Sequence, residues 1–98
     1  MTYAELIERA MKGRSVNRAA KEMGLNQRSL DRYVKSERLP DFRTALILAR
    51  EADVPLGETM IALAHEEARR NETKEIVTAG FRMLTNAVNR LFSRVAIA

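Results

Sequence analysis

Residues 15–34 read SVNRAAKEMGLNQRSLDRYV and decide the fold of this 98-residue chain. In the first half of this stretch, apolar residues recur at the i, i+3, i+4, i+7 spacing of a short helix, which Ser15 can cap and Gly24 can end. Asn26 can then cap a second short helix over residues 27–36. Two short helices joined by a three-residue turn that contains glycine predict a helix-turn-helix motif.

The second helix of this motif carries its cations opposite its apolar residues. At about 100° per residue, Leu30 and Tyr33 fall on one side, and Arg28, Arg32 and Lys35 fall on the other. Arginine can fork to guanine, glutamine can pair with adenine, and lysine can hold a phosphate. The spacing and residue types therefore favour a helix that enters the major groove of DNA, against the alternative of an ordinary solvated face.

Polar and cationic residues around the motif suit the DNA backbone. Asn17 and Arg18 lie near the N-terminus of the first helix, where unpaired N–H groups and the helix dipole attract phosphate. Arg38 and Arg43 flank the second helix on its C-terminal side. The candidates for phosphate contact are Asn17, Arg18, Lys35, Arg38 and Arg43.

The rest of the chain also has helical patterning. It contains only two prolines and four glycines, and no stretch alternates apolar and polar residues for long. Thr2 can cap a helix over about residues 3–12, and Asp41 can cap a fourth helix. A fifth helix follows the break at Pro55. The sequence therefore predicts an all-α protein.

Residues 74–96 predict one more helix with a strong amphipathic pattern. The run HEEARRNE at residues 65–72 thins the apolar signal, so we place a linker there and expect a new helix to begin at Asn71 or Thr73. The expected parts are a DNA-binding domain over residues 1–70 and a C-terminal dimerisation helix over residues 71–98.

The apolar stripe of this last helix needs a partner. A helix of about 23 residues spans about 35 Å, more than a small domain needs to close its own core. We expect a second copy of the chain to cover the stripe through a self-complementary contact. The stripe is wider than a strict a/d seam, which favours ordinary helix packing over a long leucine zipper. The expected interface residues are Val77, Phe81, Leu84, Val88, Leu91, Phe92 and Val95.

Two alternatives for this tail stay open. A cationic amphipathic helix can lie on an anionic membrane surface, with Arg82, Arg90 and Arg94 near the headgroups, although the stripe has no tryptophan. The tail can also fold back onto its own domain as a sixth core helix. We expect no membrane partner, because self-pairing explains the same residues.

Residues 15–55 resemble the Cro/C1-type, XRE-like helix-turn-helix family of small phage and bacterial repressors. The resemblance implies a five-helix, lambda-repressor-like DNA-binding domain, followed here by the long amphipathic helix. It also implies that four residues read bases, namely Gln27, Arg28, Ser29 and Arg32. The matching positions are Ala19-Ala20, Gly24, Leu25, Leu30, Tyr33, Leu39-Pro40, Ala45-Leu46, Ala49 and Val54.

The chain departs from the family pattern at two places. Many members have glutamate closely followed by glycine after the position of Tyr33, whereas this chain has Val34 and Ser36, so we expect a different turn into the fourth helix. Many also have glutamine where Val16 and Asn17 stand. The layout of the whole chain is more weakly similar to the short immunity repressors of filamentous phages.

Composition excludes several other classes of protein. The chain has no cysteine and one histidine, His65, so disulfides, thiolate metal sites and histidine clusters are ruled out. No nucleophile elbow, phosphate-binding glycine loop or HExxH run occurs, so we expect neither an enzyme nor a cofactor. The N-terminus lacks an uninterrupted apolar stretch, which favours a cytoplasmic protein.

The charge distribution favours a polyanionic partner for both ends of the chain. Residues 1–45 hold ten Lys/Arg against six Asp/Glu, residues 46–72 hold three against six, and residues 73–98 hold four against one. The net charges are therefore +4, −3 and +3.

These patterns together predict a transcriptional regulator that binds double-stranded DNA sequence-specifically. The expected form is a phage-type repressor that occupies an inverted-repeat operator as a homodimer and is released by an antirepressor protein or by its own loss. Two alternatives remain: a helix-turn-helix antitoxin whose tail binds a toxin, and a helical adaptor that binds proteins and no DNA.

Overall fold

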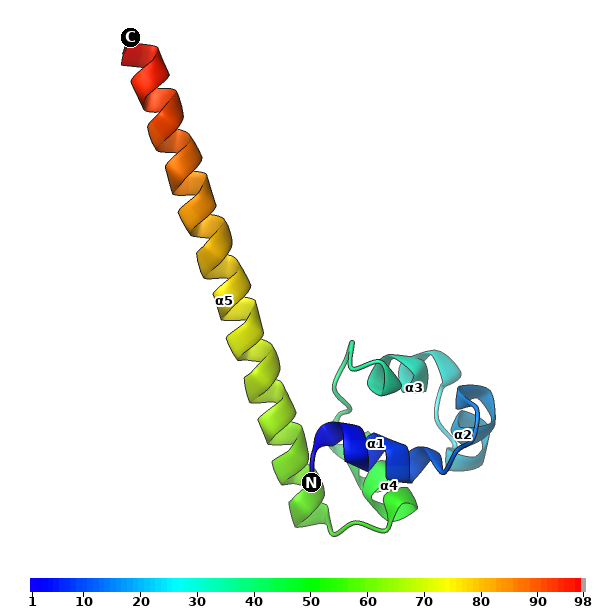
Figure 1. Ribbon diagram of the computed structural model, residues 1–98. Helices are drawn as coiled ribbons and strands as arrows, with labels where there is room; N and C mark the ends of the chain where they lie inside the picture. Colours follow the sequence, from blue (N-terminus) through cyan, green and yellow to red (C-terminus); the bar gives the residue numbers. More distant parts are fainter. Residues whose placement is uncertain (98) are drawn as a thin grey trace. The chain divides into compact units, whose positions relative to one another are not determined.

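The computed structural model describes the backbone of residues 1–97 and the side chains of residues 1–91. All the regular structure in this part of the chain is helical, as the patterning predicts (Figure 1). Two compact units are distinguished, Met1–Glu67 and Ala68–Ala98. The helices are α1 (Tyr3–Met11), α2 (Val16–Met23), α3 (Gln27–Val34), α4 (Phe42–Ala52) and α5 (Leu56–Ile97).

Side-chain caps fix where the first four helices begin. In each case the oxygen of the capping residue accepts a hydrogen bond from the backbone N–H three residues later, which satisfies one of the unpaired donors of the first turn. The predicted caps are all confirmed. The four bonds are Thr2–Glu5 (3.2 Å), Ser15–Arg18 (3.2 Å), Asn26–Ser29 (3.1 Å) and Asp41–Thr44 (2.8 Å).

The core of the first unit forms where α1 packs against α3 and α4, and α2 packs against α3. Leu6, Leu30 and Leu48 are fully buried within it. Ala19 and Ala20 are buried on α2, and their small side chains let α3 approach closely, as expected. The hydrophobic core thereby fixes the position of α3 through its buried face.

The predicted break between a fifth helix and a tail helix does not occur. Helix α5 runs without interruption through residues 65–72. Thr73 does not cap a new helix, because its hydroxyl donates to the carbonyl oxygen of Arg69 at 3.0 Å inside α5. The polar run HEEARRNE contains neither glycine nor proline, so it weakens the amphipathic signal without weakening helix propensity.

The first turns of α5 bury one polar group that lacks a partner. The Thr59 side chain is fully buried, and its hydroxyl has no hydrogen-bond partner among the side chains and backbone that the structure describes. A buried hydroxyl without a partner is destabilising. We therefore expect Thr59→Val to raise the free energy of unfolding by about 1 kcal/mol, measured by urea denaturation.

The matched control for this variant is Thr44→Val, which removes a satisfied hydroxyl. The Thr44 side chain hydrogen-bonds to the carboxylate of Asp41, so its loss is expected to lower the free energy of unfolding. Equal destabilisation by both variants would show that the Thr59 hydroxyl is satisfied in solution.

Arg14 lies in the connection between α1 and α2 and bonds to residues of α1, α2 and α4. Its guanidinium donates to the carbonyl oxygens of Met11 (3.0 Å) and Ala10 (2.8 Å), at the end of α1. It also pairs with Glu22 of α2 (2.8 Å) and Glu51 of α4 (2.7 Å). This one side chain therefore joins three helices of the first unit.

The Arg14 cluster makes stability depend on pH. Hydrogen bonds from Arg18 and Arg14 lower the pKa of Glu22, and a hydrogen bond from Arg14 lowers the pKa of Glu51, in both cases from an ordinary value of 4.5. A carboxylate with a lowered pKa stabilises the fold above its unfolded pKa, and this stabilisation is lost as pH falls through the folded pKa.

We therefore expect the urea midpoint to fall as pH is lowered below about 4.5, and Glu51→Gln to flatten this dependence. The control is Glu8→Gln, which changes an exposed glutamate of α1 that forms no salt bridge among the described side chains. A midpoint that falls as steeply in Glu51→Gln as in the parent would exclude Glu51 as a contributor.

Candidate nucleic-acid interface

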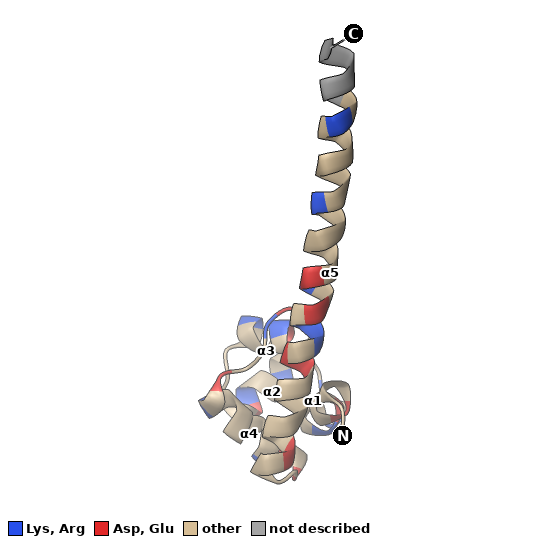
Figure 2. Cartoon of the chain, turned by 90° about the vertical axis from the view of Figure 1, so that its left-hand side faces the viewer, with Lys and Arg blue, Asp and Glu red and all other residues tan. Residues whose placement is uncertain are grey.

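Helix α3 presents two chemically different faces. Leu30 and Tyr33 are 0% and 7% exposed and face the core, whereas Arg28 and Arg32 are exposed on the other side. Figure 2 shows the concentration of lysine and arginine around α3. The predicted opposition of apolar and cationic faces is therefore confirmed.

The four residues expected to read bases all lie in the first two turns of α3. Gln27, Arg28 and Arg32 are exposed, and Ser29 is half-buried. Among the side chains that the structure describes, Arg28 and Arg32 form no salt bridge. Their guanidinium groups are thus available for two-pronged hydrogen bonds to the edge of a base.

A shallow hollow of about 450 Å³ lies on the outer side of α3, at its start. Its walls combine amide, guanidinium and carboxylate groups, which can donate and accept hydrogen bonds. The lining residues are Asn26, Gln27, Arg28 and Asp31.

Two of the five candidates for phosphate contact already have acidic partners. Lys35 Nζ lies 2.9 Å from Asp31 Oδ2, the i, i+4 pair that the sequence indicates, and this hydrogen bond raises the pKa of Lys35. Arg18 Nε lies 2.7 Å from Glu22 Oε1. Both cations remain exposed, so a phosphate must compete with a carboxylate for each of them. The other three candidates, Asn17, Arg38 and Arg43, are exposed.

The turn after α3 is held by contacts that sequence reasoning missed. Ser36 has a φ of +59°, in the left-handed region that favours glycine, and its hydroxyl donates to Glu66 Oε1 at 2.9 Å. The Tyr3 hydroxyl donates to the carbonyl oxygen of Tyr33 at 2.7 Å in a buried contact. The only signal in the sequence is the departure from the family pattern at Val34 and Ser36.

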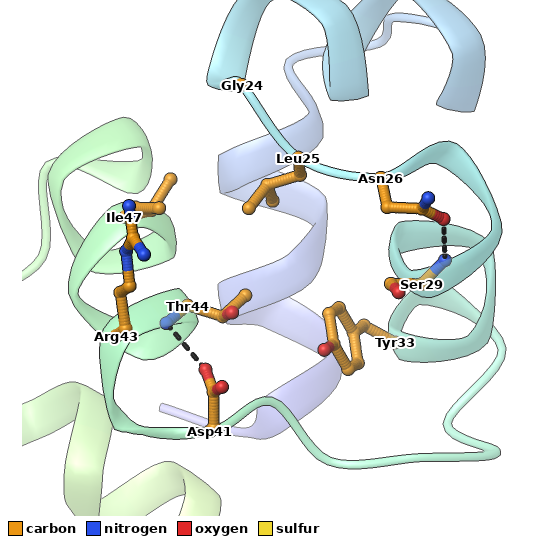
Figure 3. Close-up of a pocket in the computed structure, with 9 residues that line it drawn as sticks. All are labelled: Gly24, Leu25, Asn26, Ser29, Tyr33, Asp41, Arg43, Thr44 and Ile47. Atoms are coloured by element: carbon orange, nitrogen blue, oxygen red, sulfur yellow. Dashed lines mark hydrogen bonds between the residues drawn. The ribbon is translucent and has the colours of Figure 1, made fainter.

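A pocket of about 310 Å³ opens between the α2–α3 turn, α3 and the start of α4 (Figure 3). Its lining includes Leu25, Tyr33 and Ile47 together with the polar pair Asp41 and Arg43. Hydrogen bonds from Thr44 lower the pKa of the Asp41 carboxyl. The pocket therefore combines an apolar wall with a charged rim, and no pattern in the sequence predicts it.

Metal and membrane features are absent from the described part of the molecule. No group of three or more His, Cys, Asp or Glu among its described residues is placed to hold a metal ion. None of the helices searched over the same residues is both long and apolar enough to span a bilayer.

The capped helix pair and the exposed basic face of its second helix define the class of protein, a helix-turn-helix DNA-binding domain. A family model described as "Helix-turn-helix" matches residues 7–59, which is more than half of the chain. The chain belongs to the Cro/C1-type, XRE-like helix-turn-helix family and is a DNA-binding transcription regulator of that type. Searches of curated proteins and of solved structures gave no match.

Proposed function

We propose that this protein is a phage-type repressor that binds an inverted-repeat operator in double-stranded DNA as a homodimer. The observation that carries the proposal is the outer face of α3, where Arg28 and Arg32 are exposed without acidic partners while Leu30 anchors the opposite face. In this proposal Gln27, Arg28, Ser29 and Arg32 contact bases. Asn17, Arg18, Lys35, Arg38 and Arg43 contact phosphates.

The homodimer part of the proposal is supported by the second half of α5. Five of the expected interface residues are 40–71% exposed in the single chain: Val77, Phe81, Leu84, Val88 and Leu91. The side chains of Phe92 and Val95 lie outside the described residues. A row of exposed large apolar side chains indicates an interaction surface. Pairing of residues 71–98 in two copies would relate two DNA-binding domains, residues 1–70, by a two-fold axis, as inverted half-sites require.

Repression follows from occupancy. A dimer on an operator that overlaps a promoter excludes polymerase, and an antirepressor protein that competes for α3 or α5 would reverse the block. Both steps are proposals that rest on DNA binding by α3.

The decisive experiment is selection of bound sequences from random duplex DNA in about 150 mM salt, where sequence-independent binding is weak. The full chain is compared with Leu84→Asp, a variant that places charge in the stripe at a residue exposed in the single chain. We expect the parent to enrich an inverted repeat and the variant to enrich it far less. No enrichment by the parent would contradict sequence-specific binding.

This selection, together with sedimentation of the protein alone, separates the two alternative functions. The exposed stripe of α5 also fits an antitoxin that covers its tail with a toxin, and such a protein would enrich a sequence yet sediment as a monomer when alone. A helical adaptor would enrich no sequence and would show no salt-dependent affinity for duplex DNA.

Lys35 provides a test of the phosphate contacts. We expect Lys35→Ala to weaken binding to operator and random DNA by the same factor, and to reduce the slope of log affinity against log salt by less than the ~0.9 of an unpaired cation, because Lys35 is paired with Asp31. The matched control is Arg82→Ala, which removes the same charge from exposed α5. A loss confined to operator DNA would mean that Lys35 reads a base.

A further inference from the structure

Five of the exposed large apolar residues of α5 follow a regular heptad from Val77 onward, whereas two others, Ile76 and Met83, lie at c positions outside it. Val77, Phe81, Leu84, Val88 and Leu91 are separated alternately by four and three residues, which is the d, a, d, a, d spacing of a coiled coil. We infer that this segment pairs with the same segment of a second copy as a short, parallel, in-register, two-stranded coiled coil, in place of the ordinary helix packing that the width of the whole stripe led us to expect. The inference rests on the proposed homodimer and adds its orientation and register.

The residue types at the seam favour the parallel arrangement. Valine occupies the a position at Val88, and leucine occupies the d positions at Leu84 and Leu91. A β-branched residue at a with leucine at d is the combination that favours two parallel strands. The remaining a residue is Phe81. Its side chain is large for the space that four residues of a facing helix leave, so it needs a small residue beside it on the partner helix.

Gly80 and Ala87 supply that space. In a parallel pair, each a side chain enters a hole whose walls include the g residue that precedes the same a position on the partner. Phe81 would therefore lie against the partner's Gly80, and Val88 against the partner's Ala87. The larger side chain meets the smaller residue in both layers. In an antiparallel pair, the a side chains would meet e positions instead, where the larger Thr78 and Thr85 stand.

The length and area of the seam agree with a short dimer contact. On the N-terminal side, the same register puts Arg70 and Lys74 at d and a, where a parallel pair would bring like charges together, so the seam begins at Val77. Arg82 and Arg90 occupy b and c, away from the seam. Burying the exposed part of the five seam residues would cover about 500 Å² per helix and about 1,000 Å² in the pair, which reaches the lower range of specific interfaces.

The orientation of the two α5 helices determines at which end of the coiled coil each DNA-binding unit is attached. In a parallel pair, both α5 helices enter the seam from the same end. In the antiparallel register that uses the same seam residues, the two Ala68 Cα atoms would be separated by about 50 Å along the helix axes, at a rise of 1.5 Å per residue. Parallel pairing thus suits neighbouring half-sites one helical turn apart.

Disulfide crosslinking tests the orientation directly, because the natural chain contains no cysteine. In a parallel pair, Val88→Cys faces its own copy and should form a covalent dimer on oxidation, as should Leu84→Cys. Asn86→Cys, on the outer face, is the control and should form no covalent dimer on oxidation. The antiparallel register described above is centred on Leu84, so there Leu84→Cys would crosslink to itself and Val88→Cys would not; that pair of results would overturn the parallel orientation. Absence of any crosslink would overturn the seam.

Gly80 gives a second test through dimer affinity. A side chain added at Gly80 meets nothing within 4 Å in the single chain, so only a partner can oppose it. We expect Gly80→Leu to raise the dimer dissociation constant at least tenfold in sedimentation equilibrium, although leucine is the better helix former. Ala79→Leu, at the neighbouring outward f position, is the control and should leave the constant unchanged. Equal effects would contradict the close approach of Phe81.

These measurements use no DNA, so they fail separately from the proposed function. If the protein crosslinks through Val88→Cys but enriches no sequence, the result contradicts operator binding and supports the coiled coil. If the protein enriches an inverted repeat but Val88→Cys forms no crosslink, the result supports the repressor proposal and contradicts the parallel seam.

Discussion

Replacing Arg28 and Arg32 together with alanine is expected to weaken operator binding by about 2–6 kcal/mol, because each two-pronged contact to a base contributes about 1–3 kcal/mol of discrimination. The ratio of operator to random-DNA affinity should fall toward one. Both affinities are measured at one fixed salt concentration, because the phosphate contribution varies steeply with salt.

The double variant Arg28→Lys with Arg32→Lys is the matched control, because it keeps both charges but removes the planar fork. It should lose discrimination nearly as fully as the alanine variant while retaining affinity for random DNA. If the lysine variant keeps its preference for the operator, the planar fork of the two arginines is not what discriminates between bases, since lysine can also donate to guanine. Thermal unfolding should be nearly unchanged in both variants, since both side chains are exposed.

Leu30→Ala is expected to lower the free energy of unfolding by about 2–5 kcal/mol, the usual range for truncating a buried leucine. Leu30 is fully buried on α3, where it contributes to the core shared with α1 and α2. Since small domains are stable by about 5–15 kcal/mol in all, much of the native population would be lost near 37 °C. Urea denaturation followed by circular dichroism measures the change.

Leu46→Ala makes the same chemical change at a position of α4 that is 40% exposed. It should lower the free energy of unfolding by less than about 1 kcal/mol, because little buried surface is lost. Similar losses in the two variants would mean that Leu30 is not packed as described. DNA binding by Leu30→Ala should recover at low temperature if the variant affects only the population of folded protein.

The sequence predicted the helix-turn-helix well because the information that sets its boundaries is local. Ser15 and Asn26 accept hydrogen bonds from backbone groups three residues away, and Gly24 ends α2 with a φ of +70°. None of these contacts depends on distant parts of the chain. The apolar spacing then determined which face of α3 is buried, and so which face carries Arg28 and Arg32.

The features that the sequence did not predict depend on residues far apart in the chain or on weak patterns. Tyr3 bonds the carbonyl oxygen of Tyr33, and Ser36 bonds Glu66, each across thirty positions of sequence. The polar run at residues 65–72 predicts a helix end, but α5 continues through it because helix propensity there is high. The outward face of α3 and the pairing of Lys35 with Asp31 were predictable from spacing, whereas only the structure shows that Arg28 and Arg32 have no acidic partner among the described side chains.

If Lys35 and Arg18 contact phosphates as we propose, their pairing with Asp31 and Glu22 changes which ions DNA binding releases. A free cation that meets a phosphate displaces salt ions held by the DNA, whereas a cation that leaves a carboxylate exposes an anion that must collect its own counterions. Part of the entropic gain is thereby cancelled on the protein side. The protein should then bind unrelated DNA weakly and dissociate from it quickly. The excess of non-operator sites should therefore slow its search for an operator less.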